Sequence, residues 1–432
     1  MRRSLIPAVT LIVCACFVSQ AQVAKTYRLL SPNNKITVAI RVDQRIEYDL
    51  SLNGRLLVKD ATMALDVDHR KLGSSPQVVS ATPAAVNREL RVPVPQKFAV
   101  LQETYNELRL NFKDDYAVVF RVYNDGMAYR FETSFPQSEI KVFDEESIVK
   151  FATDFQVYYP KEEGFFSHNE REFVYLPVKE IAEKSLASIP AVVDTNTGAK
   201  LMIAESDVDD YPGLWLRGNS DNSLRATFPA YPLEEELKRD RNFRVTKTAD
   251  YIAATKGTRT FPWRIVGVAE DDAALITNHL VYLLAKPSQV DDPSWIKPGK
   301  VAWDWYNANN IYGVDFKSGI NTETYKYYID FASKHGIEYI ILDEGWYTLG
   351  NLLQVVPEMS VEELVSYGKQ RNVGIILWVV WKTLDDQFAP AFDQFTRWGV
   401  KGLKIDFMQR DDQKVMNFYD RVTREAARRH LL

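Results

Sequence analysis

Two residues near the end of the chain, Lys404 and Asp406, have the side-chain types and the spacing to act together on a substrate. They alternate with Leu403, Ile405 and Phe407, and a period of two residues is typical of a β-strand. The two charged side chains should therefore share one face of the strand, about 7 Å apart at the backbone. Burying them is costly unless they meet each other or a ligand. The pattern thus indicates either a structural ion pair or a carboxylate that does chemistry.

Three earlier apolar runs have the character of the strand that carries Asp406. The four runs cover residues 301–305, 337–342, 373–380 and 402–407. Helical patterns lie between and after them, at residues 322–335, 360–370, 391–398 and 413–430, and Ser360 with Glu363 forms a capping box at the start of the second. Apolar strands that alternate with helices predict parallel βα units with right-handed crossovers.

Polar residues follow each of these predicted strands. The ends of parallel strands meet at one edge, which in a βα barrel is the edge where active sites are built. Carboxylates after several consecutive strands are more than a stable fold requires, so a functional site is favoured over a structural ion pair. The residues concerned are Asp304, Asp343, Glu344, Lys382, Asp385, Lys404 and Asp406.

The first part of the chain, from Tyr27 to about Asp272, consists of short alternating runs separated by turns. Asn53 and Gly54 stand between two such runs and give a strong two-residue hairpin signal. A weak helical period at residues 233–238 is the exception. This pattern predicts a large antiparallel β-sandwich.

One loop of this first part, residues 165–173, combines carboxylates and an amide with aromatic residues. Oxygen atoms of this kind could bind a hard cation. The alternative is a solvated turn in which Arg171 pairs locally. The five histidines show no spacing typical of metal ligands.

The composition and the N-terminus restrict the partners and the compartment. The 53 Lys and Arg residues against 58 Asp and Glu residues form no basic block, so a nucleic-acid partner is not indicated. An apolar run at residues 5–18 after two arginines, followed by Ser-Gln-Ala at 19–21, predicts a secretory signal peptide that is too short to span a membrane. Cleavage near Ala21 would give a secreted or periplasmic protein without cysteine. A lipoprotein is the alternative, because Cys14 and Cys16 lie in a sequence that loosely resembles a lipid-attachment box.

Five segments together resemble glycoside hydrolase family 97, and they are spread over nearly the whole mature chain. The Trp-Ile-Lys-Pro-Gly sequence within the third of them is the most specific. The segments are residues 209–213, 260–264, 293–305, 342–346 and 402–408.

The resemblance implies an α+β multidomain fold. It comprises an N-terminal antiparallel β-super-sandwich at residues 22–275, a linker at 276–297, and a catalytic (β/α)8 TIM barrel that begins at residue 298. It also implies a calcium ion at the sugar site. Residues 298–432 are about half of the ~250 residues of a complete barrel, so we expect strands one to four only. The expected acid/base glutamate and most calcium ligands would lie on later strands, and we expect the 432 residues alone to be inactive.

The resemblance also separates the two branches of the family. Retaining α-galactosidases place an aspartate nucleophile at the end of the fourth strand, and that position is Asp406 here. Inverting α-glucosidases place a base glutamate in a His-rich segment after the third strand, whereas residues 377–384 contain neither Glu nor His. A retaining α-galactosidase is therefore expected, with an inverting α-glucosidase or a non-catalytic carbohydrate-binding β-sandwich as the alternatives.

The resemblance also implies roles for other residues near the ends of the predicted strands. Lys404 should favour the charged form of Asp406 and could bind a sugar hydroxyl. Asp304 and Asp343 are candidate acceptors for other hydroxyls, and Trp305 or Trp346 is a candidate stacking surface for an oligosaccharide or α-galactoside. The calcium ligand from the first domain is expected at Glu170, with Glu172 as the alternative.

Overall fold

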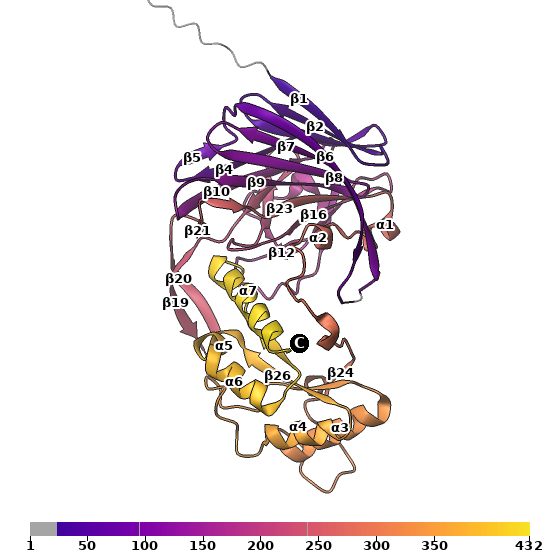
Figure 1. Ribbon diagram of the computed structural model, residues 1–432, viewed down its shortest axis with the longest axis vertical. Helices are drawn as coiled ribbons and strands as arrows, with labels where there is room; N and C mark the ends of the chain where they lie inside the picture. Colours follow the sequence, from indigo (N-terminus) through magenta and orange to yellow (C-terminus); the bar gives the residue numbers. More distant parts are fainter. Residues whose placement is uncertain (1–23, 95, 240) are drawn as a thin grey trace, which may run out of the picture.

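The computed structural model describes residues 24–432 except residues 95 and 240, so the predicted signal peptide at residues 1–21 lies outside the described part. Residues 25–269, which we call the β domain, contain two large antiparallel sheets. A parallel sheet with helices follows after residue 300, at the other end of the molecule (Figure 1). Within the described residues, no helix has the length and apolar character needed to cross a membrane.

The first large sheet has 11 strands in the order β1-β2-β3-β4-β10-β18-β17-β14-β12, with β5 beside β4 and β21 beside β10. Its strands are β1 (Lys25–Leu30), β2 (Ile36–Val42), β3 (Ile46–Leu52), β4 (Arg55–Val67), β5 (Arg70–Leu72), β10 (Ile140–Lys150), β12 (Lys161–Glu162), β14 (Leu186–Ala187), β17 (Trp215–Asn219), β18 (Ser223–Thr227) and β21 (Ala253–Thr255).

The second large sheet has 10 strands in the order β13-β11-β15-β16-β23-β9-β8-β7-β6, with β22 beside β9. Its strands are β6 (Val78–Arg91), β7 (Val100–Phe112), β8 (Tyr116–Tyr123), β9 (Gly126–Ser134), β11 (Gln156–Tyr159), β13 (Val174–Pro177), β15 (Ala191–Asp194), β16 (Lys200–Ser206), β22 (Thr258–Thr260) and β23 (Trp263–Ala269). A short 3-10 turn, η1 (Val178–Glu180), follows β13.

The core of the β domain forms because strands such as β2 and β3 bury every second residue. The predicted hairpin at Asn53 and Gly54 is confirmed: Leu52 pairs with Arg55, and both turn residues have positive φ, 51° and 78°. Two consecutive positive φ angles are typical of the type I′ turn that Asn-Gly favours. The β-sandwich prediction is therefore confirmed at the level of its architecture.

One weak local pattern in the sequence does not correspond to a helix in the structure. Residues 233–238, which show a weak helical period, lie in strand β19 (Pro232–Lys238), which pairs with β20 (Asn242–Thr248) in a separate two-stranded sheet. The ladder with β20 satisfies the backbone of this segment, and the tertiary pairing overrides a weak local preference. The β19–β20 hairpin extends from the β domain toward the parallel sheet (Figure 1).

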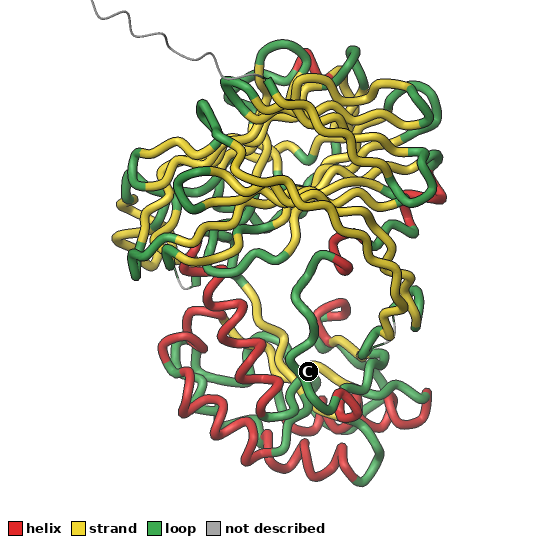
Figure 2. The backbone as a smooth tube through the Cα atoms, turned by 45° about the horizontal axis from the view of Figure 1, so that its top comes forward, coloured by secondary structure: helices red, strands yellow, loops and turns green. Residues whose placement is uncertain are grey.

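The parallel sheet has the strand order β24-β25-β26-β27, as expected for consecutive βα units. Helices gather around it, whereas the β domain consists mainly of strands (Figure 2). Its elements are β24 (Val301–Trp303), η3 (Asp304–Asn307), α3 (Thr322–His335), β25 (Tyr339–Leu342), α4 (Val361–Lys369), β26 (Gly374–Val380), α5 (Trp381–Asp386), α6 (Phe388–Trp398), β27 (Gly402–Asp406) and α7 (Gln413–Arg428).

Local signals explain where two of these helices start and stop. Ser360 precedes α4 and its side chain accepts a hydrogen bond from Glu363 N, which is the expected cap. Gly336 ends α3 in the left-handed conformation that glycine adopts without strain. The first cap sets where α4 begins, and the second sets where the chain leaves α3 and turns back into the sheet at β25.

The predicted linker, residues 276–297, contains short elements and is partly packed. It includes the end of α1 (Asp272–Ile276), α2 (Leu280–Leu283) and η2 (Pro293–Trp295). Leu280 and Leu284 are buried in a cluster with Trp263 and Ile265 of β23. Part of this segment therefore belongs to the packing of the β domain.

The β domain and the parallel sheet are joined directly after β27. Gln413, the first residue of α7, is buried, and its Nε2 donates to Asp210 O (3.0 Å), Asp210 Oδ1 (2.7 Å) and Ala254 O (2.8 Å). Its Oε1 accepts from Ala254 N at 2.9 Å. The position of the chain after Asp406 is thus fixed by the β domain.

Candidate active site

Parallel register brings the ends of β25, β26 and β27 to one edge. Leu342 pairs with Leu377, Trp378 pairs with Lys404, and Val380 pairs with Asp406. The residues that directly follow the strands therefore share a rim, as the sequence predicts.

Lys404 occupies the centre of this rim. Its Nζ lies 2.7 Å from Asp343 Oδ2, 3.9 Å from Asp406 Oδ2 and 4.0 Å from the centroid of the Trp303 ring. Lys404 and Asp406 thus share one face of β27, as predicted. The ammonium group links carboxylates from two strands and is also held by a cation–π contact.

The carboxylates of Asp343 and Asp406 are each held by one indole N–H and one backbone N–H. Trp303 Nε1 donates to Asp343 Oδ2 at 2.6 Å and Trp378 Nε1 donates to Asp406 Oδ2 at 2.9 Å. The following backbone N–H groups complete the arrangement: Glu344 N donates to Asp343 Oδ1 at 2.9 Å, and Phe407 N donates to Asp406 Oδ1 at 2.7 Å. Both carboxylates are therefore fixed in orientation.

The two tryptophans that hold the carboxylates were not predicted from the sequence. An indole N–H needs a hydrogen-bond partner when it is buried. Trp378 is buried and lies in register with Lys404. A tryptophan in an apolar strand therefore indicates that an acceptor for its N–H is nearby. The acceptor of Trp378 lies on a neighbouring strand, so spacing along the sequence could not identify it.

Asp406 and Asp343 differ in their access to solvent. The Asp406 side chain is 40% exposed, whereas that of Asp343 is 8% exposed. A carboxylate that attacks a substrate must be reachable and must keep lone pairs that are not engaged by the protein. Asp406 meets this requirement, and Asp343 is better placed to hold Lys404.

Asp304 lies deeper than the prediction of a sugar-binding acceptor suggests. It is buried, Tyr325 Oη donates to its Oδ2 at 2.6 Å, and its Oδ1 is buried without a hydrogen-bond partner among the described residues. Burial raises the pKa of this carboxyl group, and the nearby charge of Asp343 adds to the rise. This buried position favours a structural role for Asp304, in which it helps to hold the residues at the strand ends in place.

The two predicted stacking residues have opposite environments. Trp305 lies in η3 and is 63% exposed, so its ring is available to a sugar. Trp346 is completely buried, and its Nε1 donates to Trp378 O at 2.7 Å. The prediction for Trp346 is wrong, because the turn after β25 directs this side chain into the apolar core.

Lys382 and Asp385 lie on α5, which starts directly after β26. Lys382 pairs with Asp386, and Asp385 pairs with Arg421 of α7. These partners lie on α5 itself and on α7. The two residues therefore stabilise the contacts of α5 and are not part of the Lys404 cluster.

The loop that contains Glu170 contacts the chain that follows Asp406. Ser167 N donates to Gln409 O at 3.0 Å, while the Glu170 side chain is 86% exposed and lies 3.5 Å from His168 Nδ1. Arg171 pairs with Glu162 at 2.7 Å, which is the local pairing considered as the alternative. Among the described residues, no group of three or more His, Cys, Asp or Glu side chains could hold a metal ion.

A further carboxylate after β27, Asp411, is held by the β domain. Trp215 Nε1 donates to Asp411 Oδ2 at 2.6 Å, and Gly213 N donates to Asp411 O at 2.8 Å. Burial raises the pKa of Asp411 to about 7, and the charges of Glu205 and Asp412 act in the same direction. The Asp209–Gly213 segment, which is part of the resemblance, therefore contacts the loop beyond Asp406.

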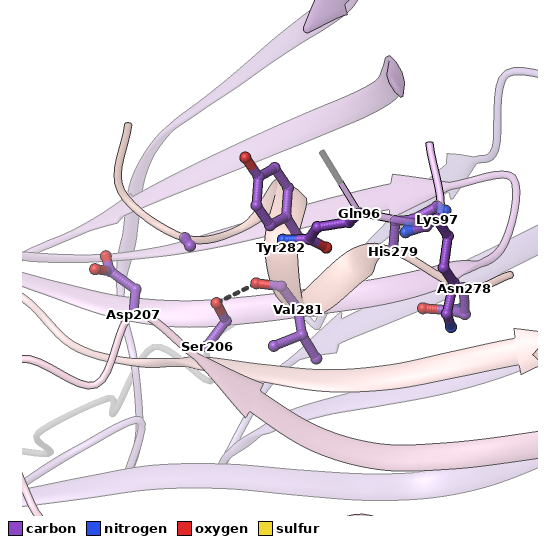
Figure 3. A pocket seen from close by; sticks show the side chains of 9 residues that line it. Gln96, Lys97, Ser206, Asp207, Asn278, His279, Val281 and Tyr282 are labelled. Carbon is purple, nitrogen blue, oxygen red and sulfur yellow. Dashed lines mark hydrogen bonds between the residues drawn. The ribbon is translucent and has the colours of Figure 1, made fainter. Parts of the chain in front are cut away.

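The pocket drawn in Figure 3 is separate from this rim. It has a volume of about 540 Å³ and lies in the β domain, beside β16 and α2. Three of its polar groups already have internal partners: Ser206 Oγ donates to Val281 O, Asn278 Nδ2 donates to Asp125 O, and Lys97 Nζ donates to Ile276 O. None of the predicted site residues lines it.

Comparison with known proteins identifies both parts of the chain. Residues 29–287 match the family model "Glycosyl-hydrolase 97 N-terminal", and residues 304–432 match "Glycoside hydrolase 97". The two matches cover the β domain and the parallel sheet, respectively.

Two relatives and one solved structure agree with this result. The chain is 37% identical over 438 residues to a retaining alpha-galactosidase of Bacteroides thetaiotaomicron, covering 98% of this chain and 66% of that protein. It is 29% identical to a probable retaining alpha-galactosidase of Streptomyces bingchenggensis, covering 76% of this chain and 48% of that protein. The chain thus spans less than two thirds of the length of the first relative and about half of the second.

The solved structure is a family 97 enzyme from Pseudoalteromonas sp. strain K8 in complex with acarbose. It superposes with a TM-score of 0.81 at 19% identity, covering 94% of this chain and 65% of that chain. At this identity the match establishes the fold. From the two family matches and the identity to the Bacteroides protein, the chain belongs to glycoside hydrolase family 97.

Proposed function

We propose that this chain forms the larger part of a secreted α-galactosidase that acts with retention of configuration, with Asp406 as the nucleophile. The observation that carries the proposal is the environment of Asp406. This carboxylate is partly exposed, is oriented by Trp378 and by the N–H of Phe407, and lies 3.9 Å from the ammonium group of Lys404. The name of the 37% identical relative supports the choice of substrate and stereochemistry.

The geometry suits the first step of a double displacement. Asp406 would attack the anomeric carbon to form a covalent glycosyl-enzyme while the bond to the leaving oxygen breaks. A protonated carboxyl group about 5–5.5 Å away would give its proton to that oxygen and would later activate the water that releases the sugar. We assign this second group to the part of the enzyme that the relatives carry beyond the matched length.

Substrate recognition is proposed for the groups around Asp406. Lys404 can donate to a sugar hydroxyl, because an ammonium group has three N–H donors and Asp343 engages it from one side. Asp343 would keep Lys404 in place. The exposed ring of Trp305 offers an apolar surface for a sugar ring.

We further propose that the parallel sheet is the first half of a (β/α)8 barrel. Leu432 N donates to Lys401 O and Leu403 N donates to Leu432 O, both at 2.9 Å. These two bonds are the pattern of a parallel pairing between Leu432 and Gly402. Leu432 thus lies where a fifth parallel strand would pair with β27.

The proposed organisation of the whole chain follows from the sequence expectations. Residues 1–21 act as a cleaved signal peptide, residues 22–275 form the super-sandwich, and residues 276–297 connect it to the catalytic domain at 298–432. The signal peptide would direct the enzyme to the periplasm or the medium. There it would act on α-galactosides.

The experiment that tests the proposed function follows the configuration of the product. It uses the extended enzyme, meaning these 432 residues followed by a C-terminal part that completes the length of the relatives. Proton NMR of the early products from an aryl α-galactoside should show the α-anomer first. An initial β-anomer would instead assign the protein to the inverting branch, and absence of hydrolysis would contradict the proposed activity.

A calcium requirement is the second proposal. The described residues do not form a complete site, and Glu170 supplies one exposed oxygen ligand from a loop that contacts Gln409 O through Ser167 N. Calcium takes six to eight oxygen ligands, so most of them would come from the later part of the enzyme. Such a site would join the β domain to the catalytic rim.

We expect chelation to lower the activity of the extended enzyme and the Glu170→Gln variant to need more calcium for half-maximal activity. The shift should be at least about 10-fold, because one anionic ligand is lost. Calcium titration of the apo-enzyme measures it. Glu163→Gln, which changes another carboxylate before the same loop, is the control, and activity that persists in excess chelator would remove calcium from the proposal.

A further inference from the structure

The hairpin β19–β20 reaches the catalytic rim from the β domain and is anchored there. Phe243 packs edge-on against Trp381, with ring centroids 6.2 Å apart. Arg410, which follows β27, donates to Phe243 O and to Glu235 Oε1, both at 3.2 Å. The hairpin therefore holds a defined position over the ends of β26 and β27.

Arg241, next to this anchor, contacts the two residues that immediately follow Asp343 and Asp406. Its guanidinium group forms an ion pair with Glu344, and it lies 5.1 Å from the centroid of the Phe407 ring. The Arg241 side chain is 18% exposed, so it is largely enclosed by its contacts. No signal in the sequence relates Arg241 to Asp406, because Arg241 lies in the turn of the β19–β20 hairpin, far from Asp406 along the chain.

Phe407 connects Arg241 to Asp406, because Arg241 lies over its ring and its backbone N–H donates to Asp406. The backbone of Phe407 is also strained. Its φ angle is 65°, in the left-handed region that an aromatic residue rarely adopts without support from its surroundings. Trp378, which donates to Asp406, contacts the Phe407 ring edge-on at 6.1 Å, and Arg241 lies over the same ring. The turn is thus held from two sides, and the Phe407 N–H to Asp406 Oδ1 bond depends on that turn.

We propose that Arg241 is a positioning residue for Asp406. The β domain supplies a guanidinium group that Glu344 holds and that packs on Phe407, and this contact keeps the strained turn in the conformation that orients the carboxylate. The β domain therefore contributes to catalysis through a specific side chain. This inference rests on the proposed function, because Asp406 must be the attacking group.

The test compares Arg241→Gln with Lys247→Gln in the extended enzyme. Lys247 lies on the same hairpin and pairs with Glu234, with both side chains about 60% exposed, so its loss leaves the rim untouched. Arg241→Gln should lower kcat on an aryl α-galactoside by about 10- to 100-fold, with KM changed less than about 2-fold, because a misplaced nucleophile affects attack more than binding. Arg241→Lys, which keeps the charge for Glu344, should recover part of the loss, and the control should match the wild type.

A second measurement separates positioning of Asp406 from other roles. In the Asp406→Gly background, azide replaces the carboxylate and does not depend on the turn at Phe407. Adding Arg241→Gln should therefore change the azide-rescued rate by less than about 3-fold. If the full loss persists with azide, Arg241 acts on the substrate or on the fold, and the inference fails.

Three other outcomes would also overturn the inference. Unchanged kcat in Arg241→Gln would overturn the inference while leaving the proposed function intact. A melting temperature of Arg241→Gln well below that of the Lys247→Gln control would assign the loss to folding and would overturn it as well. A wild-type extended enzyme without turnover would overturn the proposed function itself, and with it the inference.

Discussion

Replacing Asp406 by glycine is expected to lower the turnover of the extended enzyme by several orders of magnitude, about 10³- to 10⁵-fold. No covalent intermediate can form without this carboxylate. The fold should tolerate the change, because Asp406 is partly exposed and its two donors, Trp378 Nε1 and Phe407 N, can bond to water. Steady-state kinetics on an aryl α-galactoside measure the loss.

The Asp406→Gly variant also gives a positive result to look for. Azide or formate should partly restore activity by occupying the space of the carboxylate, and azide should give a β-galactosyl azide, because it attacks from the same side as Asp406. Asp420→Asn, an exposed carboxylate on α7 that pairs with Arg424, is the matched control and should keep full activity. Near-normal turnover in Asp406→Ala would show that another residue is the nucleophile.

Replacing Lys404 by methionine is expected to have the second largest effect, a fall in kcat/KM of about 100-fold or more. The ammonium group lies 2.7 Å from Asp343 and 3.9 Å from Asp406. Without it, the carboxylates of Asp343 and Asp406, which lie at the ends of β25 and β27, lose the positive charge between them, and the proposed donor to a sugar hydroxyl is also lost. Methionine keeps the length and the apolar stem of the side chain, so the substitution removes mainly the charge.

Lys401 provides a matched control for this substitution. It directly precedes β27 at the opposite end from Asp406 and is exposed. Lys401→Met should leave kcat/KM within about 2-fold of the wild type, because an exposed lysine far from the rim has little influence on the site. Equal losses in the two variants would indicate a general effect of removing a lysine, and an active Lys404→Met would exclude Lys404 from the mechanism.

The sequence determined the elements and the side of the sheet on which the charged residues lie. The period of two residues around Asp406 placed Lys404 on its face, and the alternation of apolar strands with helices predicted the order β24-β25-β26-β27. The hairpin at Asn53 and Gly54 was also predictable, because two positive φ angles favour that pair of residues. These features depend on contacts that are local or on a pattern that repeats along one segment.

The tertiary structure decided which partners each side chain meets. Trp346 was expected to face a sugar but is completely buried, and residues 233–238 pair in a strand despite their weak helical period. Trp378 holds Asp406 from a neighbouring strand, and Arg241 reaches Phe407 from the β domain. A hydrogen bond or a ring contact depends on atoms within a few ångströms, whereas the sequence separation of these residues carries no information about that distance. The sequence by itself therefore determined the candidate nucleophile, and only the folded chain decided what holds it in place.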